Sequence, residues 1–163
     1  TTTILHEGRV VQSGKTAEVY HRPQQVLAAE LFSEPAINLM PGRISGSEVS
    51  FADCVHFPLN PDLRGIAEGE YRFGVRPSHI GLVPSNDDDL ELAVTVELAE
   101  ISGSETFLHV RNEQFVLVLH LPGVHEYAVD TPILIYIPTH KLFVFAADGQ
   151  LVQAPSRRQG RAA

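Results

Sequence analysis

Glu91-Leu-Ala-Val-Thr-Val-Glu-Leu98 alternates polar or small residues with apolar ones over its whole length. Successive side chains of a strand point to opposite faces, so a period of two predicts one polar face directed outward and one apolar face directed inward. The inward face would consist of Leu92, Val94, Val96 and Leu98. Denser apolar runs follow, as expected of strands that are covered on both faces or curled into a barrel. These runs are residues 115–119, 133–137 and 142–145.

Weaker strand candidates lie on both sides of this stretch, at residues 43–44, 48–51, 71–75 and 106–110. Turn-forming residues fall where hairpins need them, at residues 45–47, 102–104, 111–113, 121–123 and 147–149. Many short strands, regular turns and little helix predict a mainly β fold, a small closed or partly open barrel of the OB-like kind. Two stacked small barrels, over residues 38–83 and 91–152, are the alternative.

The first part of the chain has a different pattern. We expect a hairpin over residues 4–11 with Gly8 in its turn. Thr16 is placed to cap a helical turn over residues 17–20, with Glu18 where the helix dipole favours a carboxylate. Pro23 suits the first turn of a second helix, which Ser33-Glu-Pro35 would end. That helix would carry an apolar stripe made of Val26, Leu27, Leu31 and Phe32.

The length of the chain fits one compact domain with a short appendage. Its 163 residues are 44% hydrophobic, which is enough to bury one core of roughly 100 to 150 residues. We expect a helical N-terminal segment over residues 1–38, a β domain over residues 39–152 and a disordered polar tail over residues 153–163.

The body of the chain is acidic. The net charge is −8, and three arginines fall in the last seven residues, so residues 1–154 hold 9 Lys and Arg against 20 Asp and Glu, a net charge of −11. A body of that charge repels a polyanion, which predicts that nucleic acid is not a partner.

Cysteine content and apolar runs indicate the compartment. The single cysteine, Cys54, cannot form an internal disulfide, and no apolar run approaches the roughly 18 to 20 residues that span a bilayer. Thr1-Thr-Thr-Ile-Leu-His-Glu7 lacks the basic start and apolar core of a secretory signal. We therefore expect a reducing, cytoplasmic setting, with membrane association only through a partner protein.

Gly14-Lys15-Thr16 has the ending of a phosphate-binding P-loop, Gly-x-x-x-x-Gly-Lys-Thr. The first glycine of that motif would fall at position 9, which is Arg9. The residues between are strand formers, whereas a phosphate cradle needs a loop whose backbone N–H groups converge on oxygen. We expect a strand end followed by a helix start.

Two other patterns are candidates for chemical sites. Among the eight histidines, His120 and His125 are close in sequence, but no cysteine joins them at zinc-ligand spacing, so hydrogen-bonded or solvated histidines are expected. Cys54 and His56 would share a strand face as nucleophile and base only in a regular strand. Nothing beside them marks an oxyanion site, and a small buried cysteine is the expected role.

Three segments, taken in order, carry a family resemblance: Gly8-Arg-Val-Val-Gln-Ser-Gly14, Phe73-Gly-Val-Arg-Pro-Ser-His-Ile80 and Glu100-Ile-Ser-Gly-Ser-Glu-Thr106. Together they resemble the carboxy-terminal part of the ATP-binding subunit of maltose-type and glycerol-3-phosphate-type (carbohydrate) ABC importers. The first segment is similar to the end of the nucleotide-binding domain. Ser33-Glu-Pro-Ala-Ile-Asn-Leu39 is similar to the link that leaves that domain.

The second and third segments are similar to the regulatory domain called TOBE, an OB-type, MOP-like barrel. Its Gly-Ile/Val-Arg-Pro-Glu-His motif matches here except at Ser78, where glutamate is usual, and Ser102 replaces a common leucine. The residues that match the family pattern are Gly74, Arg76, Pro77, His79, Gly103, Glu105 and Thr106.

The resemblance implies that the intact subunit hydrolyses ATP with Mg²⁺, while this chain holds no catalytic, cofactor-binding or metal residue. The Walker A loop, Walker B carboxylate, signature motif and switch histidine lie upstream in this family, and His6 does not match the switch position. By resemblance the subunit would be cytoplasmic and peripheral at the inner membrane through permease subunits.

The resemblance also implies a regulatory domain that pairs with its twofold mate. The runs at 115–121 and 133–145 hold more apolar side chains than one face of a small barrel buries, so we expect a homodimer. Two alternatives remain. Related barrels bind oxyanions such as molybdate, for which Ser102, Ser104 and Thr106 could supply hydroxyls. An OB-type nucleic-acid binder is the weaker alternative, because the chain has no tryptophan and only 7% aromatic residues.

Overall fold

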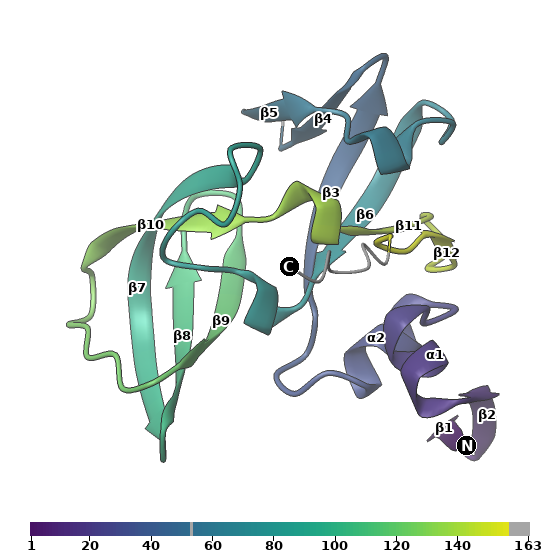
Figure 1. Ribbon diagram of the computed structural model, residues 1–163, viewed down its shortest axis with the longest axis horizontal. Helices are drawn as coiled ribbons and strands as arrows, with labels where there is room; N and C mark the ends of the chain where they lie inside the picture. Colours follow the sequence, from purple (N-terminus) through teal and green to yellow (C-terminus); the bar gives the residue numbers. More distant parts are fainter. Residues whose placement is uncertain (53, 157–163) are drawn as a thin grey trace, which may run out of the picture.

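Two β-sheets face one another across a shared apolar core in the computed structural model of the chain (Figure 1). The structure describes residues 1–52 and 54–156, so most of the predicted tail lies outside the described residues. The mainly β, OB-like prediction is confirmed: strands dominate, one sheet is curled into a half-barrel, and the two α-helices are short.

The larger sheet has six antiparallel strands in the spatial order β12-β11-β6-β3-β4-β5. The strands are β3 (Asn38–Ser45), β4 (Glu48–Phe51), β5 (Val55–Pro58), β6 (Gly69–Val75), β11 (Phe143–Phe145) and β12 (Leu151–Gln153). Sequence patterns predicted neither β5 nor β12. Both are short edge strands with little apolar periodicity, and pairing with a longer neighbour holds them in place.

The smaller sheet, in the order β10-β7-β8-β9, is the curled one. Its strands are β7 (Leu90–Ser102), β8 (Glu105–Arg111), β9 (Val116–Pro122) and β10 (Pro132–Ile137). A register shift between Val96 and Leu98 marks a β-bulge in β7. The bulge moves the following residues to the other face, so Leu98, predicted inward, pairs with His109 and is 50% exposed.

One core joins the two sheets. Residues of β3, β4 and β6 pack with residues of β7, β8, β9 and β10 in a single buried cluster. The alternative of two stacked barrels is wrong, because β11 and β12 return from the second half of the chain to complete the first sheet. Strand β11 is buried on both faces, as predicted, whereas β9 alternates between buried and more exposed residues and is fully covered on one face only.

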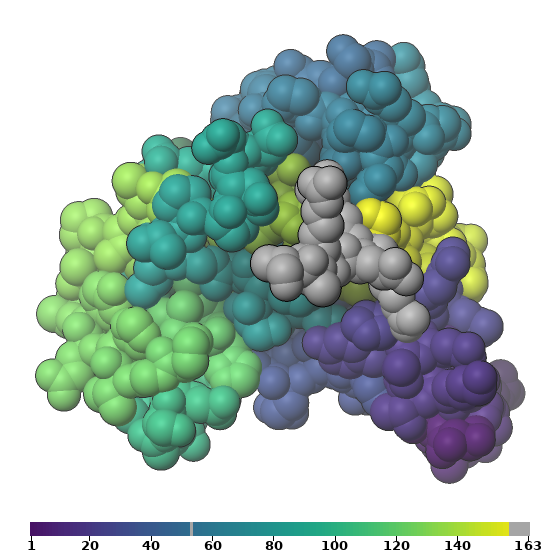
Figure 2. Space-filling view, in the orientation of Figure 1, coloured from purple at the N-terminus to yellow at the C-terminus, as the bar shows by residue number. Residues whose placement is uncertain are grey.

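The N-terminal segment (residues 1–35) packs against the ends of β11 and β12 (Figure 2). It contains the hairpin of β1 (Thr2–His6) and β2 (Arg9–Gly14), then α1 (Thr16–His21) and α2 (Val26–Leu31). Glu7 and Gly8 both have positive φ, the pattern of a type I′ turn, which confirms the predicted hairpin.

Two helix starts differ from prediction. Lys15, not Thr16, is the N-cap residue of α1, and the Thr16 hydroxyl is hydrogen-bonded to that of Thr2 at 2.7 Å. Helix α2 begins at Val26 instead of Pro23, because the Gln24 carbonyl accepts a hydrogen bond from the Leu151 amide and Gln25 forms a β-bridge with Gln150.

The apolar stripe predicted for α2 is only partly correct. Val26 is buried as expected, but Leu31 is 51% exposed, and the other buried side chains of the helix are those of Ala28 and Ala29. The described part of the chain also contains three short 3₁₀ helices: η1 (Pro61–Leu63), η2 (Pro77–His79) and η3 (Thr139–Lys141). Among the described residues, no helix has the length and apolar character to cross a membrane.

Candidate functional site

The second of the three family segments, residues 73–80, runs from the end of β6 through η2. Gly74 lies where the side chains of Ile37 and Phe145 pack closely against β6. A Cβ at this position would lie 2.9 Å from Ile37 Cδ1 and 3.1 Å from Phe145 Cε2. The lack of a side chain therefore lets the link at Ile37 and strand β11 approach β6. Pro77, the first residue of η2, is buried and has the fixed φ that suits this position.

Arg76 is the central residue of this site. Its side chain is 2% exposed, and its guanidinium carbon lies 3.8 Å from the centre of the Tyr20 ring and 5.4 Å from that of Phe143. Nη2 donates a hydrogen bond to the Tyr20 carbonyl oxygen. Burial lowers the pKa of Arg76 from its ordinary value, and the interaction with Tyr20 opposes that shift. Arg76 thus joins α1 to the β domain through a cation–π contact and a hydrogen bond.

His79, at the end of η2, lies in a basic environment. Burial, followed by the charges of Lys141, Arg76, His140 and His21, lowers its pKa to about 4. The imidazole is therefore neutral at pH 7. The charged groups that act on His79 are thus basic, in a protein whose net charge is −8.

A small hollow of about 280 Å³ adjoins Arg76. It is lined by residues of the N-terminal segment and of the β domain, namely Tyr20, Phe32, Ser33, Glu34, Arg76, Pro77, Ser78 and His120. His120 Nε2 lies 3.1 Å from the Glu105 carboxylate, and its ring centre lies 4.8 Å from that of Phe107. The structure thus connects Glu105 of the third family segment, residues 100–106, to the surroundings of Arg76 through His120.

Gly103 and Thr106 organise the far end of the curled sheet. Gly103 has a φ of 62° in the two-residue turn between β7 and β8, whereas the φ of Ser104 is not positive. A positive φ at the first turn residue only is the pattern of a type II′ turn. Thr106 is fully buried; its hydroxyl donates to the Gly123 carbonyl at 2.8 Å and accepts from the His125 amide at 3.0 Å. These contacts fix the loop after β9 against the hairpin.

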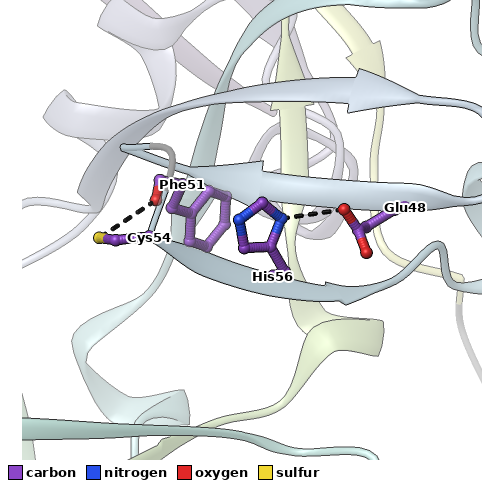
Figure 3. A network of polar contacts seen from close by, with 4 residues as sticks. All are labelled: Glu48, Phe51, Cys54 and His56. Carbon is purple, nitrogen blue, oxygen red and sulfur yellow. Dashed lines mark hydrogen bonds and ion pairs between the residues drawn. The ribbon is translucent and has the colours of Figure 1, made fainter.

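The Cys54 and His56 pair does not form a nucleophile and base (Figure 3). Cys54 lies between β4 and β5, with Sγ 3.7 Å from the Phe51 carbonyl oxygen. It is exposed, whereas a buried cysteine was expected. His56 Nδ1 lies 2.9 Å from the Glu48 carboxylate. Cys54 lies outside β4 and β5, so strand alternation does not place it on one face with His56.

The remaining candidates from the sequence, the Gly14-Lys15 segment and the histidines, have structural roles. Gly14 ends β2 and Lys15 precedes α1, as predicted for a strand followed by a helix. His125 Nε2 lies 2.9 Å from the Pro122 carbonyl oxygen, and His120 is paired with Glu105. Within residues 1–52 and 54–156, no group of three or more His, Cys, Asp or Glu side chains has metal-site geometry.

Two buried amide side chains had no signal in the sequence. Asn38 Nδ2 donates to the Val118 carbonyl, and Asn38 Oδ1 accepts from the Val118 amide, each at 2.8 Å, which links the two sheets. Gln12 accepts from the Gln24 amide at 2.9 Å and donates to the Arg22 carbonyl at 3.1 Å. The partner of Asn38 is 80 residues away, so no local pattern could reveal it.

Curated relatives align with nearly the whole chain. The sn-glycerol-3-phosphate import ATP-binding protein UgpC of Salmonella typhimurium is 30% identical over 92% of this chain, and UgpC of Paraburkholderia xenovorans is 29% identical over 87%. The sulfoquinovosyl glycerol transport ATP-binding protein SmoE of Agrobacterium fabrum is 30% identical over 88%. The chain is homologous to ABC importer ATP-binding subunits.

The homology is confined to the carboxy-terminal part of these subunits. The chain spans about two fifths of the length of the relatives, 41% or 42% of each. The alignment with these relatives confirms the resemblance to ABC importer ATP-binding subunits that the ordered motifs indicated. No family model matches the chain.

Proposed function

We propose that this chain is the carboxy-terminal regulatory and dimerisation region of the ATP-binding subunit of an ABC importer for a sugar, polyol or glycerol phosphate. The observation that carries the proposal is the alignment of 92% of the chain with the carboxy-terminal part of a glycerol-phosphate import protein. In the intact subunit, ATP and Mg²⁺ would bind in the preceding part, permease subunits would be the membrane partners, and the location would be cytoplasmic. The chain alone would hydrolyse nothing.

A chimera tests this role. The ATP-binding part of the Salmonella typhimurium relative would be joined to this chain in place of its own carboxy-terminal part, and uptake of sn-glycerol-3-phosphate would be compared with that of the truncated subunit. We expect the chimera to restore uptake that the truncated subunit loses. A chimera no better than the truncated subunit, at equal abundance, would contradict the proposal. The isolated chain should release no phosphate from ATP.

The proposed dimer is supported by the outer face of the curled sheet. The strand register places Leu98 of β7, Val116 of β9 and Leu134 of β10 on the face opposite the core, and they are 50%, 68% and 46% exposed. Exposed apolar side chains on one sheet face favour association with a second copy.

Light scattering after size exclusion at micromolar concentration tests the dimer. We expect a mass of twice 17.9 kDa for the wild type and a shift to the single-chain mass for the double variant Leu98→Lys, Leu134→Lys. Val83→Lys is the matched control, because Val83 is 74% exposed in the loop between η2 and β7. A measured mass of 17.9 kDa for the wild type in solution would contradict dimerisation. An unchanged mass for the double variant would place the contact elsewhere.

The oxyanion alternative has a simple test. The Thr106 hydroxyl already donates to Gly123 and accepts from His125, so it is not free to bind molybdate in this conformation. Calorimetry with molybdate and tungstate would favour the alternative if it detected tight binding.

A further inference from the structure

We propose that the outer face of the six-stranded sheet binds the phosphate group of a small ligand between Arg43 and Arg72. The site is a hollow whose lining residues fall between Pro41 and Ala147. It is separate from the β7–β8 hairpin of the molybdate alternative, and it does not depend on the proposed function.

The hollow lies on the face of the large sheet that is turned away from the shared core. Strand β3 contributes Met40 and Ile44 to that core, so alternation directs Pro41 and Arg43 to the opposite face. The strand register pairs Pro41 with Arg72 of β6, which puts both arginines on this outer face. The volume of the hollow is about 480 Å³, within the range of small-molecule sites.

Neither arginine has a charged partner. Within the described part of the chain, Arg43 forms no ion pair or hydrogen bond, and the one hydrogen bond of Arg72 runs from Nη2 to the Ala147 carbonyl at 3.4 Å. A guanidinium has five N–H donors, and a separation of 3.4 Å is long for a hydrogen bond. Most of the donor capacity of both side chains is therefore available to a ligand.

Two carboxylates lie close to the arginines in the fold without pairing with them. Glu70 lines the hollow directly opposite Arg43 in the register, yet these two residues form no ion pair in the part of the chain that the structure describes. Asp148, next to Ala147, accepts a hydrogen bond from the Gln150 amide at 3.0 Å. Two arginines thus line the hollow against one carboxylate in a chain of net charge −8, an arrangement that favours an anion.

A phosphate group fits this arrangement better than a carboxylate. Arg43 and Arg72 are diagonal neighbours on adjacent strands, at a separation of roughly 7–8 Å that long side chains bridge. A phosphate monoester carries about −1.5 to −2 charge at pH 7 and has three acceptor oxygens, so it can accept from both guanidiniums at once. Ser50, opposite Arg43 on β4, adds a hydroxyl donor to the same hollow.

Isothermal titration calorimetry on the full chain tests the site. The probes are inorganic phosphate and sn-glycerol-3-phosphate, with glycerol as the uncharged comparison. We expect saturable binding of at least one phosphate and none of glycerol. Tighter binding of the ester would identify a phosphate ester as the ligand, and equal or tighter binding of inorganic phosphate would identify the free anion. Binding of neither phosphate, or equal binding of glycerol, would overturn the proposal.

Single substitutions locate the binding. Arg43→Gln and Arg72→Gln should each weaken it by about tenfold or more, because each removes a charge-assisted hydrogen bond. Arg9→Gln is the matched control: it removes the same charge from an exposed arginine of β2, outside the hollow.

Glu70→Gln changes the affinity in the opposite direction. It should tighten phosphate binding, since it removes the carboxylate that repels the anion, and damage to the fold would not raise affinity. Equal weakening by Arg9→Gln and the two arginine variants of the hollow would overturn the site. Weaker binding in Glu70→Gln would do the same.

Discussion

Replacing Asn38 should uncouple the two sheets. Its side chain is 7% exposed and makes two hydrogen bonds of 2.8 Å to the backbone of Val118 on β9. Asn38→Ala removes both bonds and leaves an amide and a carbonyl of β9 without their partners. Each net hydrogen bond contributes about 0.5–1.5 kcal/mol, and unpaired buried groups add to the loss, so we expect about 2–4 kcal/mol of destabilisation.

Urea unfolding followed by far-ultraviolet circular dichroism measures this loss. With a slope of about 2 kcal/mol/M, the midpoint should fall by about 1–2 M while the slope is unchanged. Asn86→Ala is the control, because Asn86 is an exposed residue of the loop before β7 whose side chain donates to Ser85. A midpoint within 0.2 M of the wild type, on the order of the resolution of such experiments, would refute the role of Asn38.

Asn38→Asp separates the two hydrogen bonds. A carboxylate still accepts from the Val118 amide but faces the Val118 carbonyl without a proton to donate. Burial disfavours the charged form, so protonation at low pH restores the donor. The difference in stability from the wild type should therefore shrink as pH falls below about 5, and a difference that grows instead would contradict the geometry.

Two further variants test packing and titration. Gly42→Ala places a Cβ 2.6 Å from Phe51 Cδ1 and 2.9 Å from Phe73 Cδ2, so overpacking should cost about 1–3 kcal/mol and lower Tm by about 2–12 °C in a thermal scan. Gly14→Ala, whose nearest contact is 3.5 Å, should change Tm little, and equal shifts would count against overpacking. The pKa of His79 falls from 6.5 to about 4 on folding, so the unfolded chain binds more protons between these values and stability declines as pH falls through that range. His79→Gln should flatten this decline in pH-dependent urea unfolding, and a slope equal to the wild type would argue against a buried neutral imidazole.

Strand positions and hairpin turns could be predicted because their signals are local. The alternation before the bulge in β7 and the turn at Gly103 depend on neighbouring residues alone, and both were confirmed. The outward position of Leu98 could not be predicted, since the bulge is set by pairing with β8. The predicted start of α2 was wrong for a similar reason: pairing with residues 149–151 holds Gln24 and Gln25 out of the helix.

The sequence alone determined the β-rich fold and, through the order of its short motifs, the kinship with importer subunits, because periodicity and motif order are properties of the linear chain. Only the tertiary structure decided what the motif residues do. Arg76 meets Tyr20 across 56 positions, and Asn38 meets Val118 across 80. Such contacts depend on how the sheets and helices pack, and packing brings together side chains whose separation along the chain carries no pattern.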